Sequence, residues 1–325
     1  MSNTKPSIVV TDFAFPDLST EQQILTAAGC EVTGRQCKTE TDLIELCQDA
    51  DAVITQFARV NANVINAMTR ARVIVRYGIG VDNVDLEAAR ARNIPVCNIP
   101  DYCMDEVADH TLAFILATTR QVVPHTVHLR AGNWSLAVPL TGMRTLSDLT
   151  VGVVGFGRIG RAVVKRLAGF SCAILVFDPL VPAAEIEKLG AWAASFDELL
   201  KAADVLTLHC PSTPQTRRLM NRDTFAKLKP GASFINIGRG DLVDTPALTE
   251  ALQSGRLSAA ALDVFDPEPI PADHPILRMP NVILSPHSAS ASPAAVKKLR
   301  ETAAYLALRA VRGDRLVNIV NGVKV

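Results

Sequence analysis

Residues 151–178 read VGVVGFGRIGRAVVKRLAGFSCAILVFD. The apolar run at 151–154 predicts a buried strand, and the pattern G-x-G-x-x-G follows it directly, before a helical pattern begins. A second apolar run, at 174–177, predicts another strand and ends in Asp178. A strand, a glycine triplet, a helix, a second strand and an acid in this order predict a βαβ unit that binds a dinucleotide.

The three glycines of the triplet have different predicted roles. Gly155 permits the tight turn, Gly157 lets backbone amides approach a pyrophosphate, and Gly160 lets the helix pack closely on the strand. The helix N-terminus favours the negative charge of the pyrophosphate. Asp178 lies where an acid accepts hydrogen bonds from an adenosine ribose, and no arginine follows it to receive a 2′-phosphate. NAD is therefore the expected cofactor.

Length and composition limit the kinds of protein that this chain can be. With 325 residues and 48% hydrophobic content it can bury two cores, so two domains are expected. Thirty-three basic and thirty-three acidic residues cancel, so we expect neither nucleic acid nor an anionic membrane as a partner. Small molecules and further copies of the chain are the expected partners.

The cysteines and the amino end indicate where the protein works. Seven cysteines without a C-x-x-C pair favour reduced thiols over a disulfide or zinc framework. The amino end lacks the charged and long apolar regions of a signal peptide, and the apolar helix pattern at 107–118 is too short to span a bilayer. A cytoplasmic location is therefore predicted.

Alternating strand and helix patterns predict the remaining architecture. Between residues 7 and 99, short β-branched runs alternate with helical patterns, which favours a parallel sheet with helices on both faces. A longer apolar helix at 105–120 would carry the chain into a second unit, which continues to about residue 287. A last helix is predicted with Ser292 as its N-cap and Gly313 as its end.

On these residues the chain resembles the D-isomer-specific 2-hydroxyacid dehydrogenase family, which includes phosphoglycerate dehydrogenase and the glyoxylate and hydroxypyruvate reductases. The resemblance covers nearly the whole chain. Besides the glycine triplet, the motifs that carry it are RYGIGVDN at 76–83, VADHT at 107–111, LHCP at 208–211, NIGRG at 236–240, DVFDPEP at 263–269 and SPH at 285–287.

The resemblance implies an α/β fold of two doubly wound parallel-sheet domains. Residues 1–101 plus 289–325 would form a flavodoxin-like substrate domain, and residues 102–288 an inserted Rossmann NAD-binding domain. The active site would lie in the cleft between the two domains, and the protein would be a homodimer built on the nucleotide domain. Because the sequence ends at Val325, we expect no additional C-terminal regulatory domain.

Three residues could supply what the nicotinamide does not in the reduction of a 2-oxo acid. Arg239 stands in a glycine-flanked turn after a strand, and its planar fork matches a carboxylate. His287 also follows a strand, and an imidazole suits proton delivery to a carbonyl oxygen. Glu268 lies in a proline-bounded loop, from which it would orient the ring of His287 and favour its protonated form. Taken singly, these could be a surface arginine, a structural histidine and a loop acid; the resemblance favours the catalytic interpretation.

The resemblance also implies contacts to the cofactor and the substrate. The expected cofactor-binding residues are Gly155, Gly157, Arg158, Ile159, Gly160, Asp178, Cys210, Pro211, Ile237, Gly238, Arg239, Asp263 and His287. The expected substrate-binding residues are Arg76, Gly78, Ile79, Gly80 and Arg239. Cys210 would line the adenosine side without acting as a nucleophile, and no metal is expected, because the other histidines lack metal-ligand spacing.

Two alternative functions and the choice of substrate stay open at this point. C-terminal-binding-protein corepressors resemble the same family and use NAD(H) as a sensor of assembly, although this chain lacks their long disordered or charged tails. Formate or phosphite oxidation is less favoured, because formate dehydrogenases carry glutamine where Glu268 stands and phosphite oxidation uses a lysine near Arg76. Glyoxylate, hydroxypyruvate and phosphohydroxypyruvate are all candidate substrates, the last because Arg59 and Arg76 would add positive charge.

Overall fold

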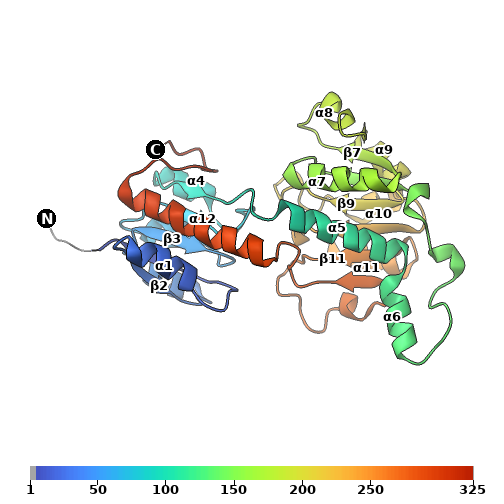
Figure 1. Cartoon of the computed structure of the whole chain (residues 1–325), viewed down its shortest axis with the longest axis horizontal. Coiled ribbons are helices and arrows are strands. Elements are labelled where there is room, and N and C mark those ends of the chain that lie inside the picture. The colour runs from blue at the N-terminus through green and yellow to red at the C-terminus, as the bar shows by residue number, and fades with distance from the viewer. Residues whose placement is uncertain (1–4, 325) are drawn as a thin grey trace. The chain divides into compact units, whose positions relative to one another are not determined.

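The computed structural model describes residues 5–324 and divides the chain into two compact units. The first unit contains the residues up to Tyr102 together with those from Ser292 onward, and the second contains Cys103–Ala291. Each unit has its own parallel sheet with helices (Figure 1). The predicted α/β class with two parallel-sheet domains is confirmed. Within the described residues, every helix is too short or too polar to cross a membrane.

The first unit is a five-stranded parallel sheet in the order β2-β1-β3-β4-β5, as in flavodoxin-like folds. Its strands are β1 (Ser7–Val10), β2 (Glu31–Gly34), β3 (Ala52–Thr55), β4 (Ile74–Arg76) and β5 (Val96–Cys97). Its helices are α1 (Ser19–Ala27), α2 (Glu40–Cys47), α3 (Ala62–Ala67), α4 (Leu86–Ala91) and α12 (Pro293–Arg312). The strand runs predicted from the sequence therefore form this sheet.

Alternate strand residues of the first unit face two separate cores. Ile8 and Ile54 lie in a core with Leu25 of α1 and Leu299 of α12, whereas Val53 faces a second core with α2, α3 and α4. Figure 1 shows α1 and α12 side by side. The last helix is confirmed as predicted, with Ser292 accepting a hydrogen bond from the Ala295 amide and Gly313 in a left-handed C-cap.

The second unit is a seven-stranded parallel sheet in the order β12-β11-β10-β9-β6-β7-β8, the arrangement of a Rossmann fold with an added edge strand. Its strands are β6 (Thr150–Val154), β7 (Ala173–Phe177), β8 (Trp192–Ala193), β9 (Val205–Leu208), β10 (Ala232–Asn236), β11 (Leu257–Leu262) and β12 (Val282–Leu284). Its α-helices are α5 (Met104–Thr119), α6 (Val122–Arg130), α7 (Arg158–Leu167), α8 (Ala183–Glu187), α9 (Phe196–Ala202), α10 (Arg222–Lys227) and α11 (Thr245–Gln253).

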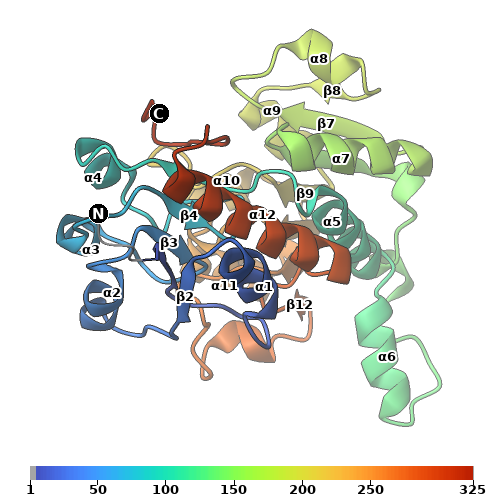
Figure 2. The ribbon, with the colours of Figure 1, turned by 60° about the vertical axis from the view of Figure 1, so that its left-hand side comes forward.

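The long apolar helix predicted near residue 105 is α5, the first helix of the second unit. It begins directly after the boundary between the units and packs within the second one, against α7 and the strands β10 and β11. That placement explains why the inward face of α5, with Val107, Leu112, Phe114 and Ile115, is apolar. By contrast, α6 extends away from the rest of this unit (Figure 2).

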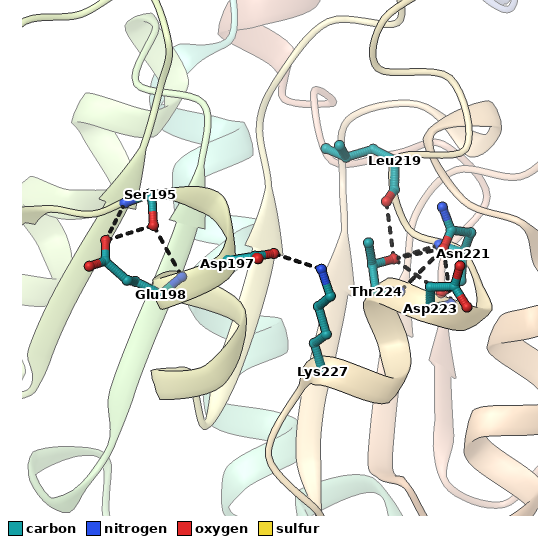
Figure 3. A network of polar contacts seen from close by, with 8 residues as sticks. All are labelled: Ser195, Asp197, Glu198, Leu219, Asn221, Asp223, Thr224 and Lys227. Carbon is teal, nitrogen blue, oxygen red and sulfur yellow. Dashed lines mark hydrogen bonds and ion pairs between the residues drawn. The ribbon is translucent and has the colours of Figure 1, made fainter.

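Reciprocal caps stabilise the first turns of α9 and α10, the helices that precede strands β9 and β10. Figure 3 shows Ser195 and Glu198 capping α9 reciprocally, with the Ser195 amide donating to the Glu198 carboxylate over 2.9 Å. Asn221 and Thr224 cap α10 in the same way, and Lys227 joins the two helices through Asp197 at 2.8 Å. Helix α9 is followed by β9 and helix α10 by β10, so both capped helices directly precede strands of this sheet.

Candidate active site

The glycine turn after β6 has the shape that a dinucleotide requires. Gly155 has a φ of +96°, and a Cβ added to it would lie 2.7 Å from the amide nitrogen of Cys210. A Cβ on Gly160 would lie 2.1 Å from the carbonyl oxygen of Gly155, so helix α7 packs as closely as predicted. A Cβ on Gly157 would meet no atom within 4 Å. The open side of the turn therefore lies at Gly157, the N-cap of α7, where backbone amides can meet a pyrophosphate.

Asp178 lies directly beside this turn. Its Oδ2 accepts a hydrogen bond from the Phe156 amide at 2.7 Å, and its Oδ1 accepts one from the Leu180 amide at 2.9 Å. A carboxylate has about four acceptor sites, so two backbone bonds orient the group and leave capacity for ribose hydroxyls. The turn and the acid together fit an adenosine dinucleotide.

The loop after β9 borders the same turn. Burial raises the pKa of the Cys210 thiol to about 11, so this thiol stays protonated and suits the predicted lining role better than a nucleophilic one. Burial lowers the pKa of the neighbouring His209 to about 3, and its Nε2 lies 2.9 Å from the Thr207 hydroxyl. His209 is therefore neutral near pH 7.

Three adjacent strands bring the predicted catalytic residues to one edge of the second sheet. Arg239 follows β10, Glu268 lies in the loop after β11, and His287 follows β12. His287 Nδ1 lies 2.8 Å from Glu268 Oε2, and Glu268 Oε1 accepts a hydrogen bond from the Phe265 amide at 2.8 Å. The side chains of His287 and Glu268 are 27% and 32% exposed, so the pair is partly shielded yet reachable.

The electrostatics of Glu268 favour its ionised form. Burial raises the pKa of its carboxyl, but the hydrogen bond and charge of His287, the Phe265 amide and the charge of Arg239 outweigh burial and hold the pKa below its ordinary value. Glu268 is therefore a carboxylate at neutral pH, and its Oε2 accepts a hydrogen bond whenever Nδ1 of His287 carries the proton.

A glycine brings the turn of Arg239 against the loop of Glu268. A Cβ on Gly240 would lie 1.9 Å from the backbone of Phe265, so only glycine permits this approach. Asn236 closes the turn, because its amide group donates to the Arg239 carbonyl at 2.7 Å and its oxygen accepts from the Gly238 amide at 3.1 Å. Sequence reasoning noted Asn236 in a motif but did not assign this role, which a polar residue at the end of a buried strand could have suggested.

Asp263 and Ser285 hold His287 in an unusual conformation. His287 has a φ of +52°, and its amide donates to the Asp263 carbonyl at 2.8 Å. The buried Asp263 carboxylate accepts hydrogen bonds from the Ser285 hydroxyl and from the amides of Ser288 (2.8 Å) and Ala289 (3.0 Å). A non-glycine residue in this region is uncommon and often marks a functional site. The expected contact of Asp263 with the nicotinamide carboxamide stays a prediction.

Ser285 also connects this edge to α5. Its hydroxyl lies 3.2 Å from His110 Nε2, and the His110 ring stacks edge-on against Phe114 with ring centroids 4.5 Å apart. Neither His110 nor Ser285 was expected to support the site. The motifs VADHT and SPH contain these two residues, but nothing in the sequence indicated that their side chains meet.

In the first unit, the predicted substrate-binding residues form a turn after β4. Arg76 is buried, and a Cβ on Gly78 would lie 1.4 Å from Arg76 Nη1, so the guanidinium lies across the glycine backbone. The Gly78 amide donates to the Arg76 carbonyl at 2.9 Å. The expected binding of a substrate carboxylate by the amides of Ile79 and Gly80 stays a prediction. Arg59 lies exposed in the loop after β3.

A flavodoxin-like sheet, a Rossmann sheet with an open glycine turn, and a histidine–glutamate pair at the edge of that second sheet define a two-unit dinucleotide-binding protein. Residues 112–289 match the family model described as "D-isomer specific 2-hydroxyacid dehydrogenase, NAD binding domain". The chain belongs to the D-isomer-specific 2-hydroxyacid dehydrogenase family, and the second unit is its NAD-binding domain. The resemblance and the cofactor predicted from the sequence are confirmed.

Several relatives are similar along most of the chain. It is 38% identical to D-3-phosphoglycerate dehydrogenase of Methanocaldococcus jannaschii, covering 97% of this chain and 59% of that protein. It is 35% identical to glyoxylate reductase of Korarchaeum cryptofilum, covering 86% and 85%. The crystal structure of D-lactate dehydrogenase from Aquifex aeolicus with NAD and lactic acid superimposes with a TM-score of 0.85 at 29% identity, covering 94% and 96%. The chain spans between half and three-fifths of the length of several curated phosphoglycerate dehydrogenases that it matches.

Proposed function

We propose that this protein is an NAD-dependent D-2-hydroxyacid dehydrogenase that interconverts a 2-oxo acid and a D-2-hydroxy acid. The observation that carries the proposal is the His287–Glu268 pair beside Arg239, at the edge of an NAD-binding sheet. NADH, when bound, supplies the hydride for the carbonyl carbon. The protein then has to hold the acid and deliver a proton to the carbonyl oxygen.

The proton would come from Nε2 of His287. Its Nδ1 is occupied by Glu268 Oε2 at 2.8 Å, so the other ring nitrogen is the one that can reach a substrate oxygen. Glu268 acts through the ring by orienting it and by favouring its protonated form. In the oxidation direction the neutral ring accepts the proton of the hydroxyl group at the same nitrogen.

Arg239 would hold the carboxylate of the substrate and polarise its carbonyl group. Its Nη1 donates to the Gly238 carbonyl at 2.8 Å, which fixes the plane of the guanidinium. An arginine carries five donors in a rigid fork, so further N–H groups can bind an oxo acid in two contacts. Asn236 and Gly240 keep this arginine in the turn from which it acts.

The first unit would be the substrate domain and would bind the acid through residues 76–80. The amides of Ile79 and Gly80 and the guanidinium of Arg76 suit an anionic group. We propose a small or polar 2-oxo acid, with glyoxylate, hydroxypyruvate and phosphohydroxypyruvate as candidates. Relatives named for glyoxylate and for 3-phosphoglycerate support this range, and the exposed Arg59 would favour a phosphorylated acid.

We also propose that the protein is a cytoplasmic homodimer assembled on its NAD-binding domain. Apolar side chains on α6 and the segment after it are exposed, among them Val127 (62%), Trp134 (92%) and Leu140 (72%). A surface of this kind favours association with another copy. The free cysteines suit a reducing compartment. Sedimentation equilibrium of the wild type and of Val127→Asp tests the dimer, with a monomeric wild type as the contrary result.

Steady-state oxidation of NADH tests the proposed activity. The wild-type protein would be assayed with glyoxylate, hydroxypyruvate, phosphohydroxypyruvate and pyruvate, and the chirality of each product determined. We expect a D-2-hydroxy acid and a kcat above roughly 1 per second for at least one acid. Tight NADH binding without turnover of any 2-oxo acid would instead favour a sensor related to the corepressors.

A further inference from the structure

A buried ion pair lies in the first unit, which contains none of the three proposed catalytic residues. Glu21, in the first turn of α1, has no exposed surface, and Arg300 of α12 bonds both of its oxygens, with Nε 2.9 Å from Oε1 and Nη2 2.7 Å from Oε2. Arg300 Nη2 also donates to the Asp17 carbonyl at 2.8 Å. Desolvation cancels much of the stability that such a pair contributes, so a conformational role is a better account of it.

A side chain in the turn that follows β4 also forms a hydrogen bond to the buried pair. The Tyr77 hydroxyl donates to Glu21 Oε1 at 2.8 Å, and Tyr77 is only 1% exposed. The Tyr77 ring contacts the Phe15 ring edge-on, with 5.4 Å between the centroids. The Arg300 guanidinium lies over the Phe15 ring, 5.0 Å from its centroid. Burial and the negative charge of Glu21 raise the pKa of the Tyr77 phenol, so the hydroxyl remains a donor.

Tyr77 lies between the residues proposed to bind the substrate. It directly precedes Gly78, which has a φ of +143° and carries the Arg76 guanidinium against its backbone. On the other side of the turn, the Ile99 amide donates to the Gly78 carbonyl at 2.9 Å and Asn98 Nδ2 to the Ile79 carbonyl at 2.7 Å. A rotation of the backbone at Tyr77 would therefore move both the guanidinium and the amides of Ile79 and Gly80.

We infer that Tyr77 is a positioning residue for the 2-oxo acid, and that the Glu21–Arg300 pair is the fixed point to which it is attached. The pair joins α1 to α12, and the hydrogen bond from the Tyr77 phenol to Glu21 holds residues 76–80 in place relative to these helices. This inference rests on the proposed function, because it assumes that this turn binds the substrate. It adds a determinant of substrate affinity that itself touches neither substrate nor cofactor.

Tyr77→Phe tests the inference with little risk to the fold. The variant removes only the hydroxyl, and Glu21 keeps both of its bonds to Arg300, so no buried charge is left uncompensated. We expect KM for the oxo acid to rise roughly tenfold. We expect kcat and the Kd for NADH to stay within about twofold of the wild type. Tyr305→Phe is the matched control, because Tyr305 is 53% exposed on α12 and should leave every constant unchanged.

A second variant tests the same contact from the side of the acceptor. Glu21→Gln keeps an acceptor for the phenol but weakens its bond, so KM should rise, and the double variant should raise KM by less than the product of the two single effects. An unchanged KM in Tyr77→Phe, with a lowered Tm, would show a purely structural contact and overturn the inference while leaving the proposed function intact. A wild-type protein that turns over no 2-oxo acid would overturn both.

Discussion

The carboxyl edges of the two sheets hold their acids in opposite ways. In the first unit, the Asp12 carboxylate is 8% exposed and accepts hydrogen bonds from the amides of residues 56–58, and Glu21 is completely buried beside Arg300. In the second unit, Glu268 is about one-third exposed and shares one oxygen with His287. In the first unit, buried carboxylates bind backbone amides and an arginine and so fix the loops, whereas in the second unit the titratable Glu268–His287 pair is accessible to a ligand.

This difference predicts which kinetic constant a substitution at each edge should change. Changes at the edge of the first sheet should alter how well the acid binds and appear mainly in KM. Changes to the His287–Glu268 pair at the edge of the second sheet should alter proton transfer and appear mainly in kcat. His287→Asn tests this division in the second unit, and Tyr77→Phe tests it in the first; Arg239→Lys and Asp178→Ala probe substrate and coenzyme binding in the second unit.

The largest effect is expected for His287→Asn. It removes the proton donor, while the proposed contacts to the substrate carboxylate stay in place, so kcat for reduction should fall by roughly 10² to 10⁴. Kd for NADH should change little. His274→Asn is the control, because His274 caps a short helix through the Ile276 amide and asparagine can also serve as a cap. Near-normal turnover of His287→Asn at neutral pH would mean that another group donates the proton.

Arg239→Lys should have the next largest effect. Lysine keeps the positive charge but loses the planar fork, so kcat/KM for the oxo acid should fall by roughly 10- to 100-fold through both a higher KM and a lower kcat. NADH affinity, measured by fluorescence titration, should stay nearly the same. A drop in NADH affinity alone would place Arg239 on the cofactor rather than on the substrate.

Asp178→Ala should reduce the preference for NADH over NADPH. The carboxylate lies beside the glycine turn, where it would bind ribose hydroxyls and repel a 2′-phosphate. Its loss should narrow the ratio of kcat/KM values by about tenfold, chiefly by weakening NADH. Comparison of both coenzymes in the wild type comes first, because a wild type that prefers NADPH would contradict the assignment outright.

The sequence predicted those parts of the fold that depend on local patterns. Strand, glycine triplet and acid follow one another within residues 151–178, and their physical requirements are met by neighbours in sequence. The long C-terminal helix was also predictable from the sequence, because its N-cap and its terminal glycine flank an apolar stripe. The edge strand β8 was not predicted, because two exposed residues carry no periodic pattern.

Contacts between distant segments could not be read in the same way. Glu21 and Arg300 are 279 positions apart, and burial of a charged pair runs against the usual preference of these residues for the surface. The bonds of Ser285 to Asp263 and to His110 likewise depend on how three elements meet. The pairing of Glu268 with His287 was predicted only through the family resemblance, since a loop and a strand separate them.

The smallest effect is expected for Glu268→Gln, as a shift in the pH at which the rate of reduction falls. This variant shows whether Glu268 and His287 act as one acid–base unit. The lowered pKa of Glu268 means that its charge is complete above the ordinary value of 4.5 and is lost only as the pH falls through the lowered pKa. Between about pH 6 and 10 the carboxylate is therefore constant, and its effect on the ring can be measured.

The measurement is kcat/KM for reduction of the oxo acid across that pH range, in the wild type and in Glu268→Gln. Reduction requires a protonated His287, so the rate falls as the pH rises, and removal of the carboxylate should move this fall to lower pH by about one unit, equivalent to about 1.4 kcal/mol. Oxidation of the D-2-hydroxy acid should begin at correspondingly lower pH. If kcat/KM falls at the same pH in both proteins, and Glu268→Gln lowers the rate equally at every pH, Glu268 only positions the ring and the proposed electrostatic coupling is wrong.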